Sequence, residues 1–221
     1  MGTEGALPTE TESEKRAAAE AAAALVQDGM RVGLGTGSTV RYLLPALAER
    51  RLALRCVATS VGTELLASEL GIEVEPFDAL DELDIAIDGA DQVAPDGWVI
   101  KGGGGAHTRE KIVALAAERF VVIASSDKVV EALQPPVPLE LLPFGLPATL
   151  RALGSARLRA GAPPSPDGGV IADHYGPFAN PAPLAARLDA TPGVVDHGLF
   201  PSTMVSDVFI ARGATVEHRR V

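Results

Sequence analysis

Short apolar segments alternate with longer amphipathic segments along about the first 130 residues, and this alternation limits the fold more than any other feature of the sequence. The apolar segments have the length of strands, and the segments between them have the length and boundary residues of helices. Strands that alternate with helices form a largely parallel sheet with helices on its faces. The sequence therefore predicts an α/β fold.

The boundaries of these elements follow from capping residues and glycines. Ser13 is expected to cap the first helix and Gly29 to end it, which leaves the acidic, polar residues 1–12 as a flexible tail. Helices are expected at 13–27, 38–50, 63–70 and 108–119, and strands at 30–34, 55–58, 72–75, 83–87, 98–100 and 120–124.

The character of the chain changes after Gln134, where five prolines fall between positions 135 and 147. Proline has no amide hydrogen to donate, so this stretch is expected to contain neither a continuous helix nor a central strand. We place a domain boundary here. Residues 13–134 together with 205–221 are expected to form the main domain, because the apolar run at 205–211 could return to the first sheet. Residues 135–204 are expected to form a smaller α+β domain, with a helix leading into a strand over 149–159, a strand ending near 171, a helix at 183–188 and a strand starting at 194–195.

Composition excludes several classes of protein. A formal net charge of −10 disfavours general binding to nucleic acid, which requires a basic surface. There is no run of about 20 apolar residues to span a membrane, and the polar N-terminus is unlike a secretory signal. The single cysteine, Cys56, suits a reducing compartment and is expected to be buried between apolar neighbours. These observations predict a cytoplasmic protein.

Four segments place glycine or polar residues directly after a predicted strand. Ligands of open α/β sheets bind beyond the carboxyl ends of the strands, so the four segments are expected to meet in space. The first is GLGTGST, from Gly33 to Thr39. Glycines allow the backbone to approach a ligand, and the amides that begin the next helix favour an anion. The segment lacks the lysine of a P-loop and the spacing of a dinucleotide fingerprint, so either a structural turn or an anion site explains it.

The second segment is DGAD, from Asp88 to Asp91. Two carboxylates this close suit a metal ion, hydrogen bonds to sugar hydroxyls, or a turn with a helix-capping aspartate. The sequence alone leaves these three alternatives open.

The third segment, KGGGGAHTREK, runs from Lys101 to Lys111. Four consecutive glycines cost conformational entropy and make sense where backbone amides surround a ligand. Apolar segments on both sides argue against a flexible linker. Glu110 is expected early in the next helix, either within the site or as a surface carboxylate paired with Arg109 or Lys111.

The fourth segment carries Lys128 just past the strand at 120–124. This ammonium group is expected either to reach the same crevice or to lie in solvent.

Taken together and in order, these strings resemble the type A ribose-5-phosphate isomerases. The resemblance rests on GTGST, DGAD, KGGGGA–TREK and the late PGVV–GLF at 192–200, with VPLELLPFG at 137–145 resembling the proline-rich passage into the second domain of that family. The match covers about residues 13–200.

The resemblance implies a Rossmann-like main domain, a small α+β second domain, no metal and no other cofactor, and a homodimer or homotetramer. The implied activity is the interconversion of D-ribose 5-phosphate and D-ribulose 5-phosphate through an enediolate, in the non-oxidative pentose phosphate pathway, with a small sugar phosphate as the only expected partner. Glu110 is the implied proton carrier. The implied catalytic residues are Glu110, Asp88, Asp91 and Lys101, and the implied substrate-binding residues are Thr36, Gly37, Ser38, Thr39, Gly89, Ala90, Gly102, Gly103, Gly104 and Lys128.

The chain also departs from the pattern of this family. Gln92 stands where glutamate is frequent, and His107 stands where leucine is frequent. Lys15 and Arg16 are both candidates for a cation in the first helix that meets the phosphate. Two rival functions are a sugar-phosphate-binding sensor domain and another enzyme on a similar fold, such as an amino-sugar-phosphate deaminase or a CoA transferase.

Overall fold

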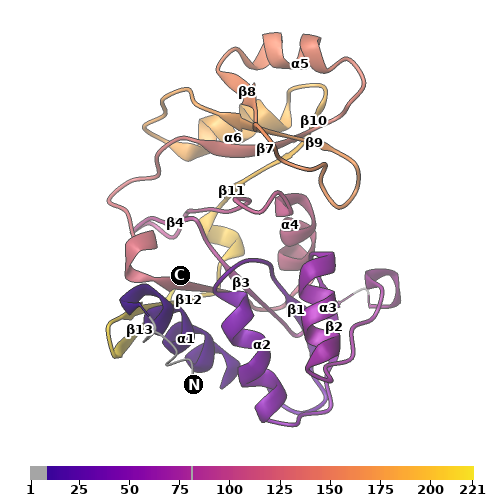
Figure 1. The fold of residues 1–221 in the computed structure, drawn as a ribbon. Coiled ribbons are helices and arrows are strands. Elements are labelled where there is room, and N and C mark those ends of the chain that lie inside the picture. The colour runs from indigo at the N-terminus through magenta and orange to yellow at the C-terminus, as the bar shows by residue number, and fades with distance from the viewer. Residues whose placement is uncertain (1–8, 81) are drawn as a thin grey trace, which may run out of the picture.

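A six-stranded sheet organises the larger part of the molecule in the computed structural model, which describes residues 9–80 and 82–221 (Figure 1). The strand order is β13-β12-β6-β3-β1-β2, and every neighbouring pair is parallel except β12 with β13. The predicted α/β class is therefore confirmed. The strands are β1 (Arg31–Leu34), β2 (Arg55–Ala58), β3 (Ile85–Gly89), β6 (Phe120–Ser125), β12 (Asp207–Arg212) and β13 (Thr215–Arg220).

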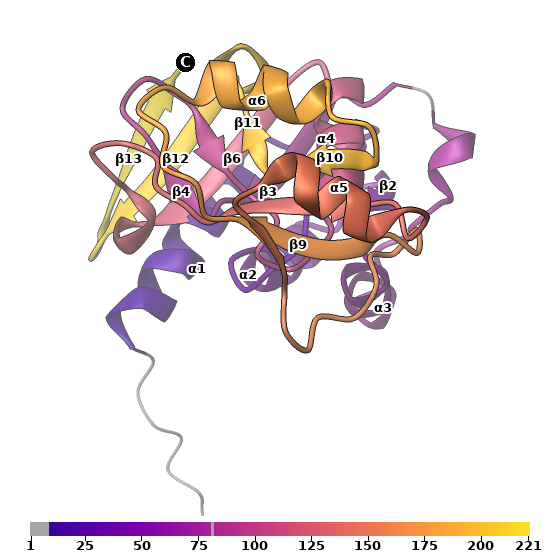
Figure 2. The same ribbon diagram turned by 90° about the horizontal axis from the view of Figure 1, so that it is seen from above.

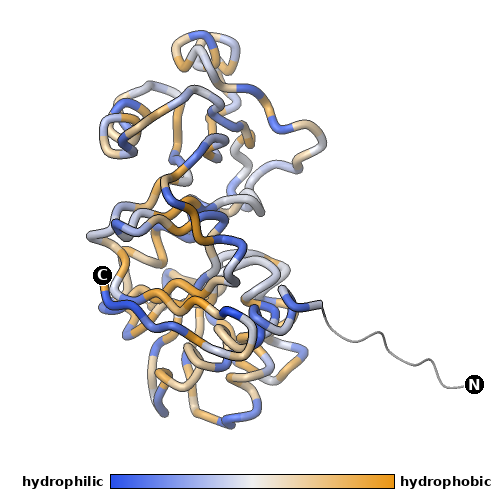
Figure 3. The backbone as a smooth tube through the Cα atoms, turned by 90° about the vertical axis from the view of Figure 1, so that its left-hand side faces the viewer, coloured by the Kyte–Doolittle hydropathy of each residue, from blue (hydrophilic) through white to orange (hydrophobic). Residues whose placement is uncertain are grey.

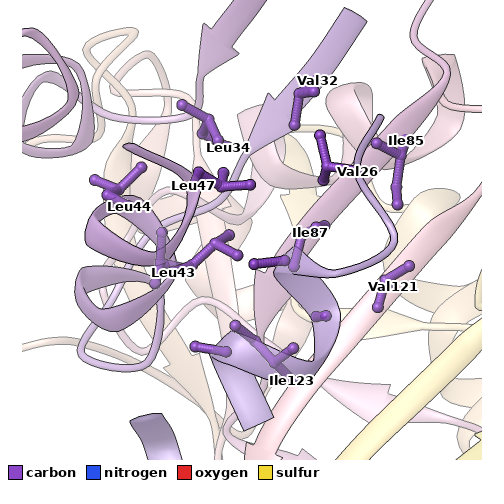
Figure 4. Close-up of a cluster of buried hydrophobic side chains, with 14 of the residues drawn as sticks. Val26, Val32, Leu34, Leu43, Leu44, Leu47, Ile85, Ile87, Val121 and Ile123 are labelled. Atoms are coloured by element: carbon purple, nitrogen blue, oxygen red, sulfur yellow. The ribbon is translucent and has the colours of Figure 1, made fainter. Parts of the chain in front are cut away.

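The central strands β3, β6 and β12 are buried on both faces, which explains why they read as continuous apolar runs. Alternate residues face opposite sides of the sheet. Ile85 and Ile87 pack with residues of α1 and α2 (Figure 4). Ala86 packs on the other side, with residues of α4. Each large aliphatic side chain buried in this way contributes about 2 kcal/mol to stability. The helices are α1 (Glu10–Ala23), α2 (Val40–Glu49), α3 (Val61–Glu69) and α4 (His107–Ala116).

Helix α1 begins earlier than the sequence analysis expected. Thr9 accepts a hydrogen bond from the amide of Glu12, and the Glu12 carboxylate accepts one from the amide of Thr9. This reciprocal capping box satisfies two amides that would otherwise lack partners, and it outcompetes Ser13 as the cap. The prediction of a cap at Ser13 and of a tail through residue 12 is wrong, because residues 10–12 form the first helical turn. Residues 1–8 of the expected tail lie outside the described residues.

A smaller unit stands above the carboxyl ends of the main strands, with α5 and α6 on its outer side (Figures 1 and 2). Its antiparallel sheet has the order β10-β7-β9-β8. The elements are β7 (Val137–Leu141), β8 (Ala156–Leu158), β9 (Val170–His174), β10 (Val194–His197), α5 (Leu146–Leu153) and α6 (Pro181–Asp189). A third, three-stranded sheet joins β11 (Leu199–Phe200) to β5 (Val99–Ile100) and β4 (Gln92–Val93), so the two units share backbone hydrogen bonds.

Strand β7 contradicts the expectation that the proline-rich stretch holds no central strand, because it pairs with both β9 and β10. The carbonyl of Pro138 accepts a hydrogen bond from the amide of Gly198, at the end of β10. The nitrogen of Pro138 lies on the same side of β7, where an ordinary residue would donate to the carbonyl of Gly198. The carbonyl of Gly198 is satisfied instead by the amide of Lys101. No acceptor is lost, and the strand tolerates its proline.

The chain returns to the main sheet at β12, which lies between β6 and β13. Strand β13, which the sequence analysis did not predict, is a polar edge strand, and the C-terminal segment is correspondingly hydrophilic in Figure 3. The expected strand at 72–75 is reduced to a single bridge between Val74 and Cys56, and Cys56 is buried as predicted. Short 3-10 helices occur at η1 (Phe77–Ala79), η2 (Ser126–Lys128) and η3 (Ser202–Met204). Within the described residues, no helix combines the length and the apolar character that crossing a membrane requires.

Candidate active site

A small cavity of about 120 Å³ lies beyond the carboxyl ends of β1, β3 and β6, where the four segments were expected to meet. The structure brings all four together. The lining residues are Thr36, Gly37, Ser38, Thr39, Gly89, Ala90, Asp91, Lys101, Gly102, Gly103, Gly104, Glu110 and Lys128. Asp88, the remaining predicted site residue, lies directly behind this lining.

Three charged side chains form the floor of the site. The Lys101 ammonium lies 2.8 Å from the carboxylate of Asp88 and 3.2 Å from that of Glu110, and it donates to the carbonyl of Gly89 at 2.6 Å. The side chains of Asp88, Lys101 and Glu110 are each at most 4% exposed. Two buried carboxylates therefore share one cation.

Local backbone geometry fixes Asp88 in place. One carboxylate oxygen accepts the amides of Thr36 at 3.0 Å and of Gly89 at 2.7 Å. Gly35 permits this approach, because a Cβ at that position would lie 2.0 Å from the Asp88 carboxylate. Gly35 is therefore required after β1, because any side chain there would collide with Asp88 of the second segment.

The shared cation and the burial shift the proton affinities of all three groups. Burial raises the pKa of Glu110 to about 8, although the charge of Lys101 opposes the shift. Burial also raises the pKa of Asp88, against the opposing influence of Lys101 and of the two backbone amides. Burial by itself disfavours the charge on Lys101, but the carboxylates of Asp88 and Glu110 outweigh it and raise the pKa of Lys101. Since Asp88 also accepts two amides, we infer that it holds the negative charge and that Glu110 holds the exchangeable proton.

Asp91 faces the cavity from the other side of the DGAD turn. Its carboxylate accepts the amide of Gly103 at 2.7 Å, so this amide already has a partner. The amides of the glycine segment are consequently not equivalent, and Gly104 lines the cavity without a comparable contact to Asp91.

The opposite end of the cavity suits an anion. Residues 36–39 precede α2, and its N-cap residue Thr39 makes no side-chain capping hydrogen bond. The first amides of a helix lack intrahelical acceptors and attract negative charge. Lys128 adds a half-buried ammonium group from η2, where it pairs with Asp127 at 3.2 Å. Neither candidate cation of α1 lines the cavity, and Arg16 stacks over the ring of Tyr42.

The arrangement disfavours a metal between the acidic side chains of this site. The Lys101 ammonium occupies the position between Asp88 and Glu110 that a cation would need, and Asp91 is directed to a backbone amide. Elsewhere in the described part of the chain, Asp189, Asp196 and His197 offer ligand atoms within 4.8 Å of one another. There the ammonium of Lys111 is paired with Asp196, which weakens that carboxylate as a metal ligand.

His107 begins α4 and is fully buried against Gly102. Neither ring nitrogen has a hydrogen-bond partner within the described structure. Burial lowers the pKa of His107 to about 3, against an opposing influence of the nearby backbone of Asp196, so the ring is neutral.

Two side chains next to the site were not anticipated from the sequence. Arg159, just after β8, donates to the carbonyls of Gly102 and Gly103. The ring of Phe200 lies 5.6 Å from the Lys101 ammonium. The motif containing Phe200 was recognised, but no local pattern distinguishes Arg159 from the other arginines of the smaller unit.

The fold and the cavity define a class: an α/β protein with buried carboxyl groups and an uncapped helix N-terminus around one small polar cavity. Comparison with known proteins then identifies the family. The family model of ribose 5-phosphate isomerase A (phosphoriboisomerase A) matches residues 55–214.

Individual relatives agree with this match. The chain is 44% identical to ribose-5-phosphate isomerase A of Methanosarcina acetivorans over 91% of this chain and 92% of the relative. The crystal structure of ribose 5-phosphate isomerase A from Neisseria gonorrhoeae matches with a TM-score of 0.90 at 32% identity, over 96% of this chain and 97% of that one. A D-ribose-5-phosphate isomerase in complex with phospho-erythronic acid matches with a TM-score of 0.90 at 32% identity, over 97% of this chain and 100% of that one. The chain belongs to the ribose 5-phosphate isomerase A family.

Proposed function

We propose that this protein interconverts D-ribose 5-phosphate and D-ribulose 5-phosphate, with Glu110 as the proton carrier. The observation that carries the proposal is the buried carboxyl group of Glu110, which borders the cavity and whose pKa is raised to about 8. General bases work best when their pKa lies near the operating pH. Family membership and the names of the relatives support the same reaction.

The reaction needs one group that reaches two adjacent carbons. Ionised Glu110 would remove the proton from C2 of the open-chain aldose, and the electron pair of that bond would form the C1–C2 double bond of an enediolate. Transfer of the O2 proton to O1 and return of the carbon-bound proton to C1 would complete the ketose. The carboxyl proton is thus conserved over the cycle, and no oxidant or reductant is needed.

Negative charge develops on O1 and O2 during this reaction and requires fixed donors. Lys101 and the amide of Gly104 are the proposed donors. The carboxylates of Asp88 and Asp91 would hold sugar hydroxyls and assist ring opening. A phosphorylated aldonic acid such as phospho-erythronic acid, the molecule bound to the solved relative, carries a planar carboxylate that resembles an enediolate.

The phosphate is proposed to bind residues 36–39 and Lys128, where the end of α2 and an ammonium group favour an anion. The rest of the proposed binding surface is formed by Gly37, Ser38, Gly89, Ala90, Gly102 and Gly103. The small volume of the cavity suits a sugar phosphate better than a dinucleotide.

The first experiment measures ribulose 5-phosphate formed from ribose 5-phosphate by the purified protein. Turnover supports the isomerase. No turnover, with binding of sugar phosphate retained, supports the rival sensor function, and ammonia released from an amino-sugar phosphate supports the rival deaminase.

The second experiment tests the role of Glu110. Glu110→Gln preserves size and removes the base, so kcat is expected to fall by at least about 100-fold, the lower end for general-base catalysis, with KM little changed. Glu20→Gln, on the exposed side of α1, is the matched control and should retain full activity. A near-normal kcat in Glu110→Gln would remove this residue from its proposed role.

Three further properties belong to the same proposal. We propose a division into a main domain (from α1 to residue 134, with 205–221) and a smaller one (135–204), a cytoplasmic location, and a homodimer or homotetramer. Phe144, which is 92% exposed, supports an interface between subunits. Light scattering of the purified protein would measure the oligomer, and full activity after exhaustive EDTA treatment would support metal-independent catalysis.

A further inference from the structure

The glycine segment that lines the cavity forms a tight turn, and neighbouring side chains form hydrogen bonds with it on two sides. The amide of Gly105 donates to the carbonyl of Gly102 at 2.9 Å, and Gly102 has a φ of 99°, a conformation that favours glycine. We call residues 102–105 the glycine turn. On its inner side, Asp91 accepts the amide of Gly103.

The outer side of the glycine turn is held by Arg159 of the smaller unit. One terminal nitrogen of its guanidinium group donates to the carbonyl of Gly103 at 2.9 Å and to that of Gly102 at 3.2 Å. The other two nitrogens donate to the two oxygens of Asp173, at 2.9 and 2.6 Å. Asp173 lies in β9 and is only 5% exposed. This two-pronged ion pair fixes the plane of the guanidinium group, which lysine could not reproduce.

The C=O and N–H bonds of a trans peptide group point in opposite directions, so the N–H bonds of the two peptide groups that Arg159 holds by their carbonyls point away from Arg159. The carbonyl of Gly102 shares a peptide group with the amide of Gly103, and the carbonyl of Gly103 shares one with the amide of Gly104. A cation on a carbonyl oxygen withdraws electron density from its peptide group and strengthens the N–H as a donor. Arg159 therefore acts on both amides, yet it does not line the cavity.

We propose that Arg159, oriented by Asp173, is a positioning residue for the isomerase reaction: it fixes the glycine turn and strengthens the Gly104 amide toward the enediolate. This inference rests on the proposed function. It assigns the smaller unit a part in catalysis, because both members of the ion pair come from that unit.

The test compares Arg159→Met with Arg157→Met. Arg157 lies in β8, two residues before Arg159, is exposed, stacks over Tyr175 and makes no contact with the glycine turn among the described hydrogen bonds. Arg159→Met is expected to lower kcat by about tenfold or more, the value of a hydrogen bond to a charged group, with less than about a threefold change in KM. Arg157→Met should keep wild-type kinetics.

Ligand binding separates positioning from a loss of folded protein. In the proposed binding mode, phospho-erythronic acid would place its carboxylate against the glycine turn, whereas inorganic phosphate would occupy only the anion end of the cavity. The affinity of Arg159→Met for phospho-erythronic acid should be about tenfold lower than that of the wild type. Its affinity for inorganic phosphate should be the same as that of the wild type. Added guanidinium ions should partly restore kcat in Arg159→Ala and should leave Glu110→Gln unchanged.

Arg159→Lys provides the same measurements if the methionine variant does not fold. Its kcat and its affinity for phospho-erythronic acid are expected to lie between those of wild type and Arg159→Met. The inference is overturned if kcat of the Arg159 variants stays within about twofold of wild type, or if affinity for both ligands falls equally. Absence of isomerase activity in the wild-type protein would instead refute the proposed function, so the two failures are distinguishable.

Discussion

Replacing Glu110 by glutamine is expected to stabilise the folded protein while it removes the proposed base. The carboxyl group is buried beside Lys101 and Asp88, and its pKa is raised from 4.5 to about 8. A raised pKa means that the folded state binds the proton more tightly than the unfolded state. The stability of the wild-type protein must therefore fall as pH rises from 4.5 toward 8.

The magnitude follows from these two pKa values. At pH 7 the unfolded chain has lost the Glu110 proton, whereas the folded protein must retain it. Retaining it across the interval from 4.5 to pH 7 costs about 3 kcal/mol, at about 1.4 kcal/mol for each pH unit. Glutamine is neutral at every pH and resembles the protonated acid in shape, so it avoids this cost. For a chain of this length, 3 kcal/mol corresponds to an increase in Tm of roughly 6–12 °C.

Thermal unfolding of wild type, Glu110→Gln and the exposed control Glu20→Gln should be recorded from pH 4.5 to pH 8. The gain in Tm of Glu110→Gln should be close to zero at the acidic end and should increase with pH, while the control should follow wild type throughout. A gain that does not depend on pH, or a loss of stability at pH 7, would refute the assignment of a buried, protonated carboxyl group.

Three other outcomes are expected. In the wild-type enzyme kcat/KM should rise with pH through an apparent pKa near 8, since Glu110 must lose its proton before it can act as a base; a midpoint at the ordinary carboxyl value of 4.5 would contradict this. Lys128→Ala should raise KM for ribose 5-phosphate by about tenfold or more through loss of a charged phosphate contact, with a smaller change in kcat, as steady-state kinetics would reveal. Gly35→Ala should reduce kcat strongly, because the added methyl group would displace the Asp88 carboxylate; wild-type kinetics in this variant would show that the close approach is not required.

The sequence was sufficient for the parallel strands of the main sheet, without the edge strand β13, and for the members of the cavity. Parallel strands buried on both faces leave continuous apolar runs, and the residues after them converge at one edge, so DGAD and the glycine segment could be placed together. The prediction that α1 begins at Ser13 is wrong because Thr9 and Glu12 form a reciprocal capping box that starts the helix earlier.

Other features depend on contacts that have no local signature. The strand around Pro138 exists because Lys101, far away in the chain, supplies the hydrogen bond that proline cannot. Arg159 reaches the glycine turn across 56 residues of sequence, and nothing near it indicates that contact. The proton affinity of Glu110 likewise depends on burial and on two charges from other segments.

The junction at Gly198 has a consequence for how this family can change over time. A methyl group at this position would lie 2.1 Å from the carbonyl oxygen of Lys101 and would also collide with Pro138. Because the nearer contact is with a backbone atom, it persists whatever side chain stands at position 101, and position 198 accepts no residue larger than glycine unless the backbone shifts. A substitution at Gly198 would push the end of β5 away from the start of β11, so a single small residue limits how closely the smaller unit can be joined to the main sheet.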